Sequence, residues 1–231
     1  YRNDTKARLV SKTYYDTSRG QGNEIANYSY SYNSLGAIKD TSVFFYGATN
    51  LRTNGAGIDE NSAMTASVSF SGNVTATLGT ITIATVASRQ SVTYYKGAAK
   101  EEVAKFTVNY DKSNGTTVKD TGIFFYGASN LLADVAGVTS DTKMTKQVSI
   151  RGVALTDVQV STLTSASSFI VVATVTYYRK SLTNFTGEKG EEKALNSTTY
   201  SIIDGTTQIS YTEYTYKADS SLDYVTTYRN D

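Results

Sequence analysis

The chain has 231 residues with 22 basic and 21 acidic side chains, and it contains no Cys, His, Trp or Pro. This near-neutral charge supplies no field that would attract nucleic acid or an anionic membrane, so we expect neither as a partner. Because the common zinc, Cys-His and Ser-His-Asp sites need His or Cys, we expect no enzyme, no cofactor and no metal site. A Ser-Lys dyad or a pair of distant carboxylates stays open.

The amino-acid composition is typical of β-strands. Thr and Ser together number 61, and 19 Tyr and 8 Phe accompany them. These residue types favour pleated strands with one wet face over helices. We therefore predict an all-β protein, a repetitive antiparallel β-sheet wound as a β-solenoid, tube or fibre.

The two ends of the sequence carry the same four residues. Such a match fits one period of a longer tandem array, 227 residues long, that is cut so that its end overlaps its beginning. The alternative is that a short motif occurs twice by chance. On the first interpretation the termini take part in self-association, either covalently in a longer chain or by docking between subunits. These residues are Tyr1, Arg2, Asn3, Asp4, Tyr228, Arg229, Asn230 and Asp231.

A Thr-Tyr-Tyr triplet recurs along the chain, at Thr13-Tyr14-Tyr15, Thr93-Tyr94-Tyr95 and Thr176-Tyr177-Tyr178. The offsets are 80 and 83 residues, and long periods of this kind indicate stacked supersecondary units. The predicted organisation has four parts. Residues 1–13 complete the preceding repeat, residues 14–93 and 94–176 form two full β-repeats, and residues 177–231 form a shortened third repeat that continues into the next period.

A polar, charged loop follows each Tyr pair, and two of these loops contain paired carboxylates, Glu101-Glu102 and Glu191-Glu192. Paired carboxylates can act as general acid and base, but adjacent strand residues point to opposite faces. We therefore predict solvated hairpin tips. Alternating aromatic stretches come next, and Asn114-Gly115 predicts a hairpin turn because both residues tolerate a positive φ.

The most closely repeated stretch covers residues 39–65 and 119–145, which share 14 of 27 positions. Each copy contains a Phe-Phe-Tyr-Gly sequence, in which Gly ends a run of bulky strand-forming residues. Because successive strand residues face opposite sides and both sides carry bulk, we predict a strand covered on both faces. The predicted core residues are Phe44, Phe45, Tyr46, Leu51, Phe124, Phe125, Tyr126 and Leu131.

Tracts rich in Thr and Val close each full repeat. Residues 74–78, 80–83 and 170–172 predict further strands. The longest apolar run, residues 169–173, is far shorter than the roughly 20 residues of a spanning helix. We predict a buried strand there and no membrane insertion.

Six Asn-x-Ser/Thr sequons could carry glycans if the chain is exported. In a chain this rich in Asn, Ser and Thr, several would arise by accident. The candidate glycosylation sites are Asn3, Asn27, Asn73, Asn114, Asn184 and Asn196.

An aromatic-x-Tyr pattern precedes several turns, as in Tyr30-Ser31-Tyr32-Asn33, Val108-Asn109-Tyr110-Asp111 and Tyr214-Thr215-Tyr216-Lys217. It resembles the tyrosine-aspartate (YD) repeats of the Rhs type, which occur in large bacterial surface or secreted proteins. The resemblance implies a continuous, spiralling sheet of β-hairpins on an exported protein, with no active site. The chain departs from that family because it lacks Gly-Arg-Leu after the turn and has a much longer repeat unit.

These features predict a structural repeat unit of an extracellular or cell-surface β-rich fibre. Its partner is then another copy of itself, joined end to end. The alternative is an adhesin or a carbohydrate-binding module, because exposed Tyr rings can stack on sugars and surface glycans would then be the partners. The exposure of the Tyr rows separates these two interpretations.

Overall fold

The computed structural model describes residues 8–230 of the chain. Strands make up 48% of it and helices 4%, so the all-β prediction is confirmed. Two short helical segments, η1 (Thr75–Thr80) and α1 (Asp157–Val160), lie in connections between strands. The strands are β1 (Ser11–Asp16), β2 (Ile25–Tyr32), β3 (Ile38–Tyr46), β4 (Met64–Ser71), β5 (Arg89–Lys96), β6 (Val103–Tyr110), β7 (Val118–Tyr126), β8 (Met144–Arg151), β9 (Phe169–Val172), β10 (Val175–Thr186), β11 (Lys193–Tyr200), β12 (Gln208–Tyr216) and β13 (Leu222–Arg229).

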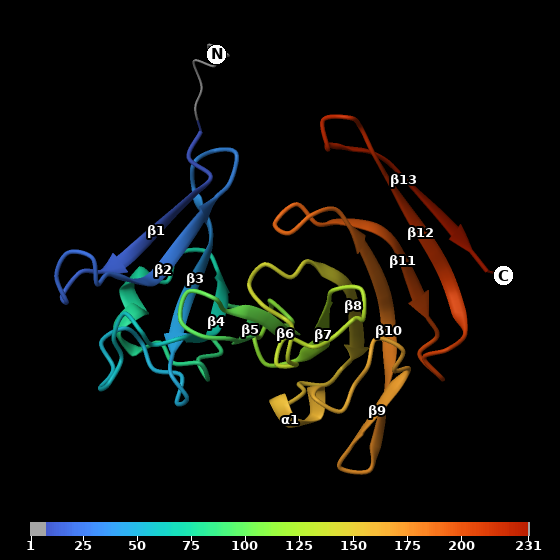
Figure 1. The fold of residues 1–231 in the computed structure, drawn as a ribbon, viewed down its shortest axis with the longest axis horizontal. Coiled ribbons are helices and arrows are strands. Elements are labelled where there is room, and N and C mark those ends of the chain that lie inside the picture. The colour runs from blue at the N-terminus through green and yellow to red at the C-terminus, as the bar shows by residue number, and fades with distance from the viewer. Residues whose placement is uncertain (1–7, 231) are drawn as a thin grey trace. The chain divides into compact units, whose positions relative to one another are not determined.

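The strands form one large antiparallel sheet that is not closed. Each strand lies beside its neighbour in the chain from β1 to β8 and from β10 to β13, β8 lies beside β10, and β9 pairs with β10 off this path (Figure 1). The chain divides into two compact units. Unit 1 holds the described residues up to Tyr94 together with Ala98–Glu102 and Tyr110–Thr117, and unit 2 holds Tyr95–Gly97, Val103–Asn109 and the residues from Val118 onward.

The strands repeat in groups of four, which we call modules: β1–β4, β5–β8 and β10–β13. A tyrosine at the end of the third strand marks the same place in each module, and its hydroxyl donates a hydrogen bond to the carbonyl of an alanine near the start of the second strand. The three bonds are Tyr46 to Ala26 (2.6 Å), Tyr126 to Ala104 (2.5 Å) and Tyr216 to Ala194 (2.9 Å). These tyrosines lie 80 and 90 residues apart, so the third module is offset from the second by 90 residues.

This offset corrects the expected position of the third Tyr pair. The register between β1 and β2 shifts at Tyr14-Tyr15, and the corresponding shift between β10 and β11 lies at Asn184-Phe185. Tyr177-Tyr178 instead pairs with β9, in a hairpin that has no counterpart in the described connection between β4 and β5. The predicted equivalence of Tyr177-Tyr178 with Tyr14-Tyr15 is therefore wrong, because the inserted hairpin brings its own Tyr pair.

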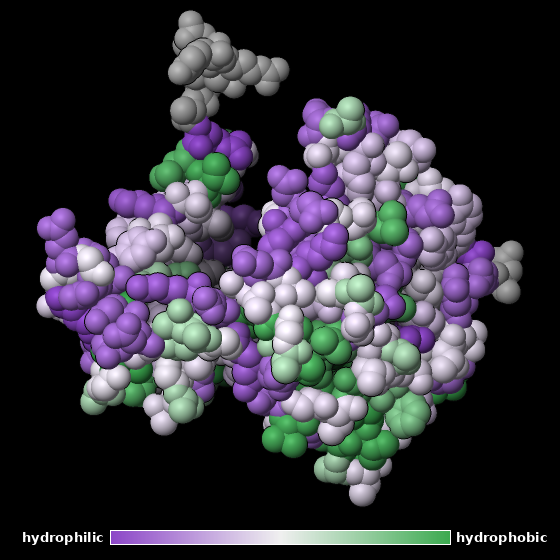
Figure 2. All heavy atoms as spheres, in the orientation of Figure 1, coloured by the Kyte–Doolittle hydropathy of each residue, from purple (hydrophilic) through white to green (hydrophobic). Residues whose placement is uncertain are grey.

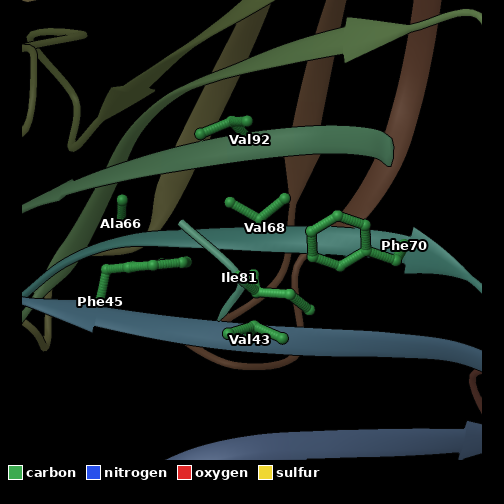
Figure 3. Close-up of a cluster of buried hydrophobic side chains, with 7 residues drawn as sticks. All are labelled: Val43, Phe45, Ala66, Val68, Phe70, Ile81 and Val92. Atoms are coloured by element: carbon green, nitrogen blue, oxygen red, sulfur yellow. The ribbon is translucent and has the colours of Figure 1, made fainter. Parts of the chain in front are cut away.

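The core of unit 1 follows from strand alternation. Val43 and Phe45 lie on one face of β3, and Ala66, Val68 and Phe70 lie on the same face of β4, since residues two apart share a face. All five are buried, and they pack together with two further buried residues, as Figure 3 shows. The remaining members of this cluster are Val92 on β5 and Ile81, which follows η1.

The predicted core residues divide between buried and partly buried positions. Tyr46 belongs to a second cluster with Ile25 and Ile58, against which Phe44 and Leu51 pack. Since Phe45 lies in the first cluster, β3 is covered on both faces, as the repeated motif predicts. The buried residues are Phe45, Tyr46, Phe125 and Tyr126, and the partly buried ones are Phe44, Leu51, Phe124 and Leu131.

Two of the predicted Thr/Val strands are absent from the described chain. Residues 74–83 form the helical turn η1 and irregular loops. The hydroxyls of Thr77 and Thr80 donate to the carbonyls of Val74 and Thr77, and such local bonds compete with a sheet ladder. The third tract does form β9, but Phe169 is 51% exposed, so only Ile170 of this strand is buried as predicted.

The helices of residues 8–230 are all too short or too polar to cross a bilayer.

Candidate functional site

Consecutive modules meet at two junctions, β4 with β5 inside unit 1 and β8 with β10 inside unit 2. The two junctions share one register, because Ala66 pairs with Tyr94 in the first and Lys146 pairs with Asn184 in the second. These positions are equivalent, since the module offsets of 80 and 90 residues separate them. The register is thus a property of the module, and it is kept although this pair changes from Ala66 and Tyr94 to Lys146 and Asn184.

A glutamate is bonded across each junction. Glu102 Oε1 accepts the backbone N–H of Met64 at 2.7 Å, and Glu192 Oε1 accepts that of Met144 at 3.1 Å. Burial acts to raise the pKa of Glu192, but backbone N–H groups of Glu192, Met144 and Gly190 outweigh it and hold this pKa below its ordinary value of 4.5. The carboxylate is therefore the form that joins one module to the next.

The prediction of solvated hairpin tips is wrong for these two residues. Glu102 and Glu192 are partly buried, whereas their neighbours Glu101 and Glu191 are exposed. One sequence signal identifies the bonded glutamates, because each stands two residues before the alanine that accepts the module's tyrosine hydroxyl. Glu24 occupies the same place before Ala26 in the first module.

A second polar contact crosses each junction. Gln90 Nε2 donates to Asp40 Oδ1 at 2.6 Å in the first, and Lys180 Nζ lies 2.6 Å from Asp120 Oδ2 in the second. The acid stands on the third strand of one module and its partner on the first strand of the next. The Asp120 side chain is only 10% exposed. Replacing it would leave the partly buried Lys180 ammonium group without this partner.

The second and third modules also share an arginine clamp, in which a buried arginine covers a tyrosine ring and bonds a glycine carbonyl. The guanidinium carbon lies 3.7 Å from the ring centroid in both clamps, and the Nε–O distances are 3.0 and 3.2 Å. Leu9 occupies the arginine position in the first module. The clamps consist of Arg89 with Tyr110 and Gly115, and Arg179 with Tyr200 and Gly205.

The outer strands β1 and β13 each have one neighbour within the described part of the sheet, β2 and β12 respectively. Both carry tyrosines on the face that forms the core elsewhere. Tyr14 stacks on Tyr28 with ring centroids 4.6 Å apart, and Tyr211 stacks on Tyr228 at 6.4 Å. Tyr228 is 53% exposed, and Tyr224, four residues before it on the same strand, is 57% exposed. These two edges are the candidate site for a partner.

The predicted terminal contacts fall partly on this site. Tyr228 and Arg229 lie in β13, and Asn230 follows it with its backbone N–H donating to Ile209. The remaining predicted positions lie outside the described residues. They are Tyr1, Arg2, Asn3, Asp4 and Asp231.

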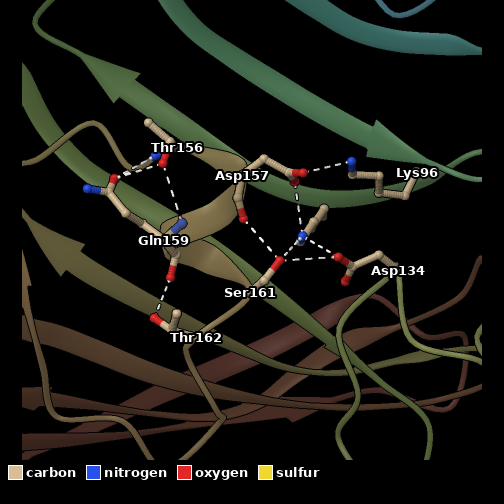
Figure 4. A network of polar contacts seen from close by, with 8 residues as sticks. Lys96, Asp134, Thr156, Asp157, Gln159, Ser161 and Thr162 are labelled. Carbon is tan, nitrogen blue, oxygen red and sulfur yellow. Dashed lines mark hydrogen bonds and ion pairs between the residues drawn. The ribbon is translucent and has the colours of Figure 1, made fainter.

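A buried lysine in unit 2, Lys105, lies in a polar network whose members Asp134, Asp157 and Ser161 are labelled in Figure 4. Lys105 Nζ lies 2.5 Å from Asp134, 3.0 Å from Asp157 and 2.7 Å from the Ser161 hydroxyl. An ammonium group has three donors, and all three have acceptors here. The contact between Lys105 and Ser161 is the geometry that a Ser-Lys dyad would need, and two carboxylates bind the same ammonium group.

Acid should weaken this cluster. Burial acts to raise the pKa of Asp157, but its hydrogen bonds and charge contacts with Lys96 and Lys105 outweigh burial and lower that pKa below 3.8. A group whose pKa is lower in the folded state than in the unfolded state stabilises the fold at pH values above its unfolded pKa. This stabilisation is lost as the pH falls through the folded-state pKa. Because solvent screens the charge, we expect the Asp157 carboxylate to contribute about 0.5–1 kcal/mol to the free energy of unfolding. Asp157→Asn should therefore lower the melting temperature by about 2 °C at pH 7 and leave it unchanged at pH 2, as calorimetry would measure. An equal loss at both pH values would contradict the charge effect.

Unit 1 also contains a surface hollow of about 470 Å³. The exposed ring of Tyr15 borders it together with Asn27, Arg52 and Asn54. Arg52 donates to the carbonyl of Leu78 and to the Asn27 side chain, while its buried Nε has no hydrogen-bond partner among residues 8–230. An aromatic ring beside amide and guanidinium groups is the type of lining that sugar rings and hydroxyls contact.

The sequons have different surroundings. Asn73 and Asn114 are exposed in loops, whereas Asn27, Asn184 and Asn196 lie on strands and are partly buried. Asn184 donates to Asn196 at 2.7 Å, so these two side chains already serve the sheet. Asn3 lies outside the described residues.

Residues 8–230 contain no cluster of three or more acidic side chains that could hold a metal ion. No protein-family model matches the chain, and a search of curated proteins finds no match.

Proposed function

We propose that this chain is a structural repeat unit of an extracellular or cell-surface β-rich fibre, in which the sheet continues from one copy into the next. The observation that supports it is the repetition of the junction. The same register and the same glutamate bond join β4 to β5 and β8 to β10, and the positions that would make a further junction stand at the outer strands. Repetition of this kind gives a β-solenoid, tube or fibre.

The chemistry of the edges supports the same proposal. An edge strand presents a row of N–H and C=O groups to any chain that can pair with it, and proteins that avoid pairing place Pro or inward charges there. The sequence contains no Pro. The exposed side chains of β13 are mainly hydroxyl, aromatic and aliphatic, which pack well between neighbouring strands. The partner that fits such an edge is another copy of the chain.

Light scattering of the purified chain tests the proposal. We expect the mean mass to grow with concentration and negative-stain electron microscopy to show filaments. Tyr224→Lys, which puts a charge on the inward face of β13, should raise the concentration needed for growth at least 10-fold. The matched control is Leu35→Lys, in a turn where Leu35 is 91% exposed, and should assemble normally. A chain that stays monomeric at the highest soluble concentration would overturn the proposal.

A second candidate function is carbohydrate binding at the hollow beside Tyr15, as part of an adhesin. The observation that favours it is the exposed ring next to the side chains of Asn27, Arg52 and Asn54. Saturation-transfer NMR with neutral and acidic oligosaccharides, compared between the native chain and Tyr15→Ala, tests this function separately from assembly.

A further inference from the structure

The outer strands carry enough information to fix how two copies meet. We infer that β13 of one copy pairs antiparallel with β1 of the next, with Tyr224 opposite Tyr14, and that the carboxylate of Glu24 accepts the backbone N–H of Leu222. The occupant of each edge is a second copy of this chain. This inference rests on the proposed end-to-end assembly and adds to it a register and a polar bond.

The register follows from the two existing junctions. The residue two positions after the start of the fourth strand pairs across the junction, as Ala66 does with Tyr94 and Lys146 with Asn184. In the third module that residue is Tyr224, because β13 begins at Leu222. On the receiving side the position of Tyr94 and Asn184 is held in β1 by Tyr14, where the same register shift occurs.

The glutamate bond follows from the same equivalences. Met64 pairs with Tyr46 and Met144 with Tyr126, and at this place in the third module Leu222 pairs with Tyr216. The N–H of Leu222 thus occupies the position of the two N–H groups that Glu102 and Glu192 accept.

Glu24 already has the geometry of an acceptor. Its Oε2 accepts the N–H of Gly22 at 2.9 Å, as Glu192 Oε2 accepts that of Gly190 at 2.8 Å. In Glu192 the other oxygen, Oε1, bonds the preceding module. Within residues 8–230, no partner is found for Oε1 of Glu24, so the oxygen that would bond a preceding copy has no competing bond there.

The side chains at the proposed junction are compatible with this register. Tyr224 would extend the stacked row of Tyr14 and Tyr28 on one face of the sheet. Arg229 occupies the position of Arg151, whose guanidinium donates to the carbonyl of Tyr200 at 2.7 Å, and the equivalent carbonyl in the next copy is that of Tyr32. The contact that joins Asp120 to Lys180 has no counterpart, because Ser210 and Val10 stand there. The glutamate bond should therefore supply a larger share of the polar stabilisation at this junction than at the junction between β8 and β10.

Cysteine cross-linking tests the register, since the chain has no Cys of its own. Tyr14→Cys and Tyr224→Cys are prepared separately, mixed and oxidised. Directly opposite strand residues lie within disulfide distance, so we expect a covalent heterodimer from this mixture. The control mixture of Tyr14→Cys with Val225→Cys, whose side chain faces the other side of the sheet, should give none.

Glu24→Gln tests the polar bond. Loss of a charge-assisted hydrogen bond should raise the concentration for half-maximal assembly about 10-fold or more, while Glu101→Gln, an exposed neighbour of the bonded Glu102, should leave it unchanged. If filaments form but Tyr14 and Tyr224 do not cross-link, or Glu24→Gln assembles normally, this inference is wrong and the fibre proposal stands. If no variant or native chain assembles, the fibre proposal itself is wrong.

Discussion

Replacing Phe125 with alanine should lower the free energy of unfolding of unit 2 by about 3–5 kcal/mol. The ring is 1% exposed and lies on β7, whose neighbouring buried residue Ile123 pairs with Val148 on β8. Alanine would remove most of the buried apolar surface and leave a cavity that the paired strands cannot close, because their backbone ladder fixes their spacing. Urea unfolding followed by tyrosine fluorescence would measure the loss.

Phe45→Ala should have a similar effect in unit 1, where the ring belongs to the cluster of β3, β4 and β5. The matched control is Phe169→Ala, since that ring is half exposed on β9 and its truncation should cost less than about 1 kcal/mol. A loss below about 1 kcal/mol at Phe125 would contradict the assignment of this residue to the core.

The repeated Phe-Phe-Tyr-Gly strands were predictable because their side chains alone define them. Aromatic and β-branched residues occupy both the odd and the even positions of these stretches. This pattern is typical of a strand covered on both faces, and β3 and β7 form there. The Thr-rich tract after β4 has the same propensity, but its hydroxyls bond neighbouring carbonyls. Ile81 is buried in the core, and Val74, Leu78 and Ile83 pack against it without forming a strand. Strand propensity therefore predicts structure only where a neighbouring strand supplies the ladder.

The register of the third module could not be read from the Tyr pairs. What the modules share at that point is backbone geometry and a few supporting groups. A glutamate and a tyrosine hydroxyl recur in all three modules, and a close-packed glycine recurs in the second and third. A local Tyr-Tyr match in the β9–β10 hairpin carries more identity than the true equivalent, Asn184-Phe185. The glutamate bond was missed for a related reason, because its partner N–H lies 38 residues away from Glu102.

Gly115→Ala should destabilise unit 1 by more than about 3 kcal/mol. The glycine has a φ of +66° after the aromatic strand β6, and a Cβ built there would lie 1.8 Å from the carbonyl oxygen of Val86. That oxygen accepts the backbone N–H of Arg89, whose side chain in turn bonds the carbonyl of Gly115. A methyl group would therefore separate two backbone segments and open the arginine clamp, and thermal unfolding would show the loss.

Gly36→Ala is the matched control, because it changes the same residue type at the equivalent turn of the first module. Gly36 has a φ of +79°, and a Cβ there would meet no atom within 4 Å. It should cost only the backbone strain of a left-handed alanine, about 1–2 kcal/mol. The difference between the two variants isolates the close approach at Gly115 from the strain that both share. Gly205→Ala in unit 2, where a Cβ would lie 2.2 Å from the carbonyl oxygen of Ser168, should behave like Gly115→Ala. Equal losses at Gly36 and Gly115 would show that the turn conformation, and not the packed connection, makes glycine necessary.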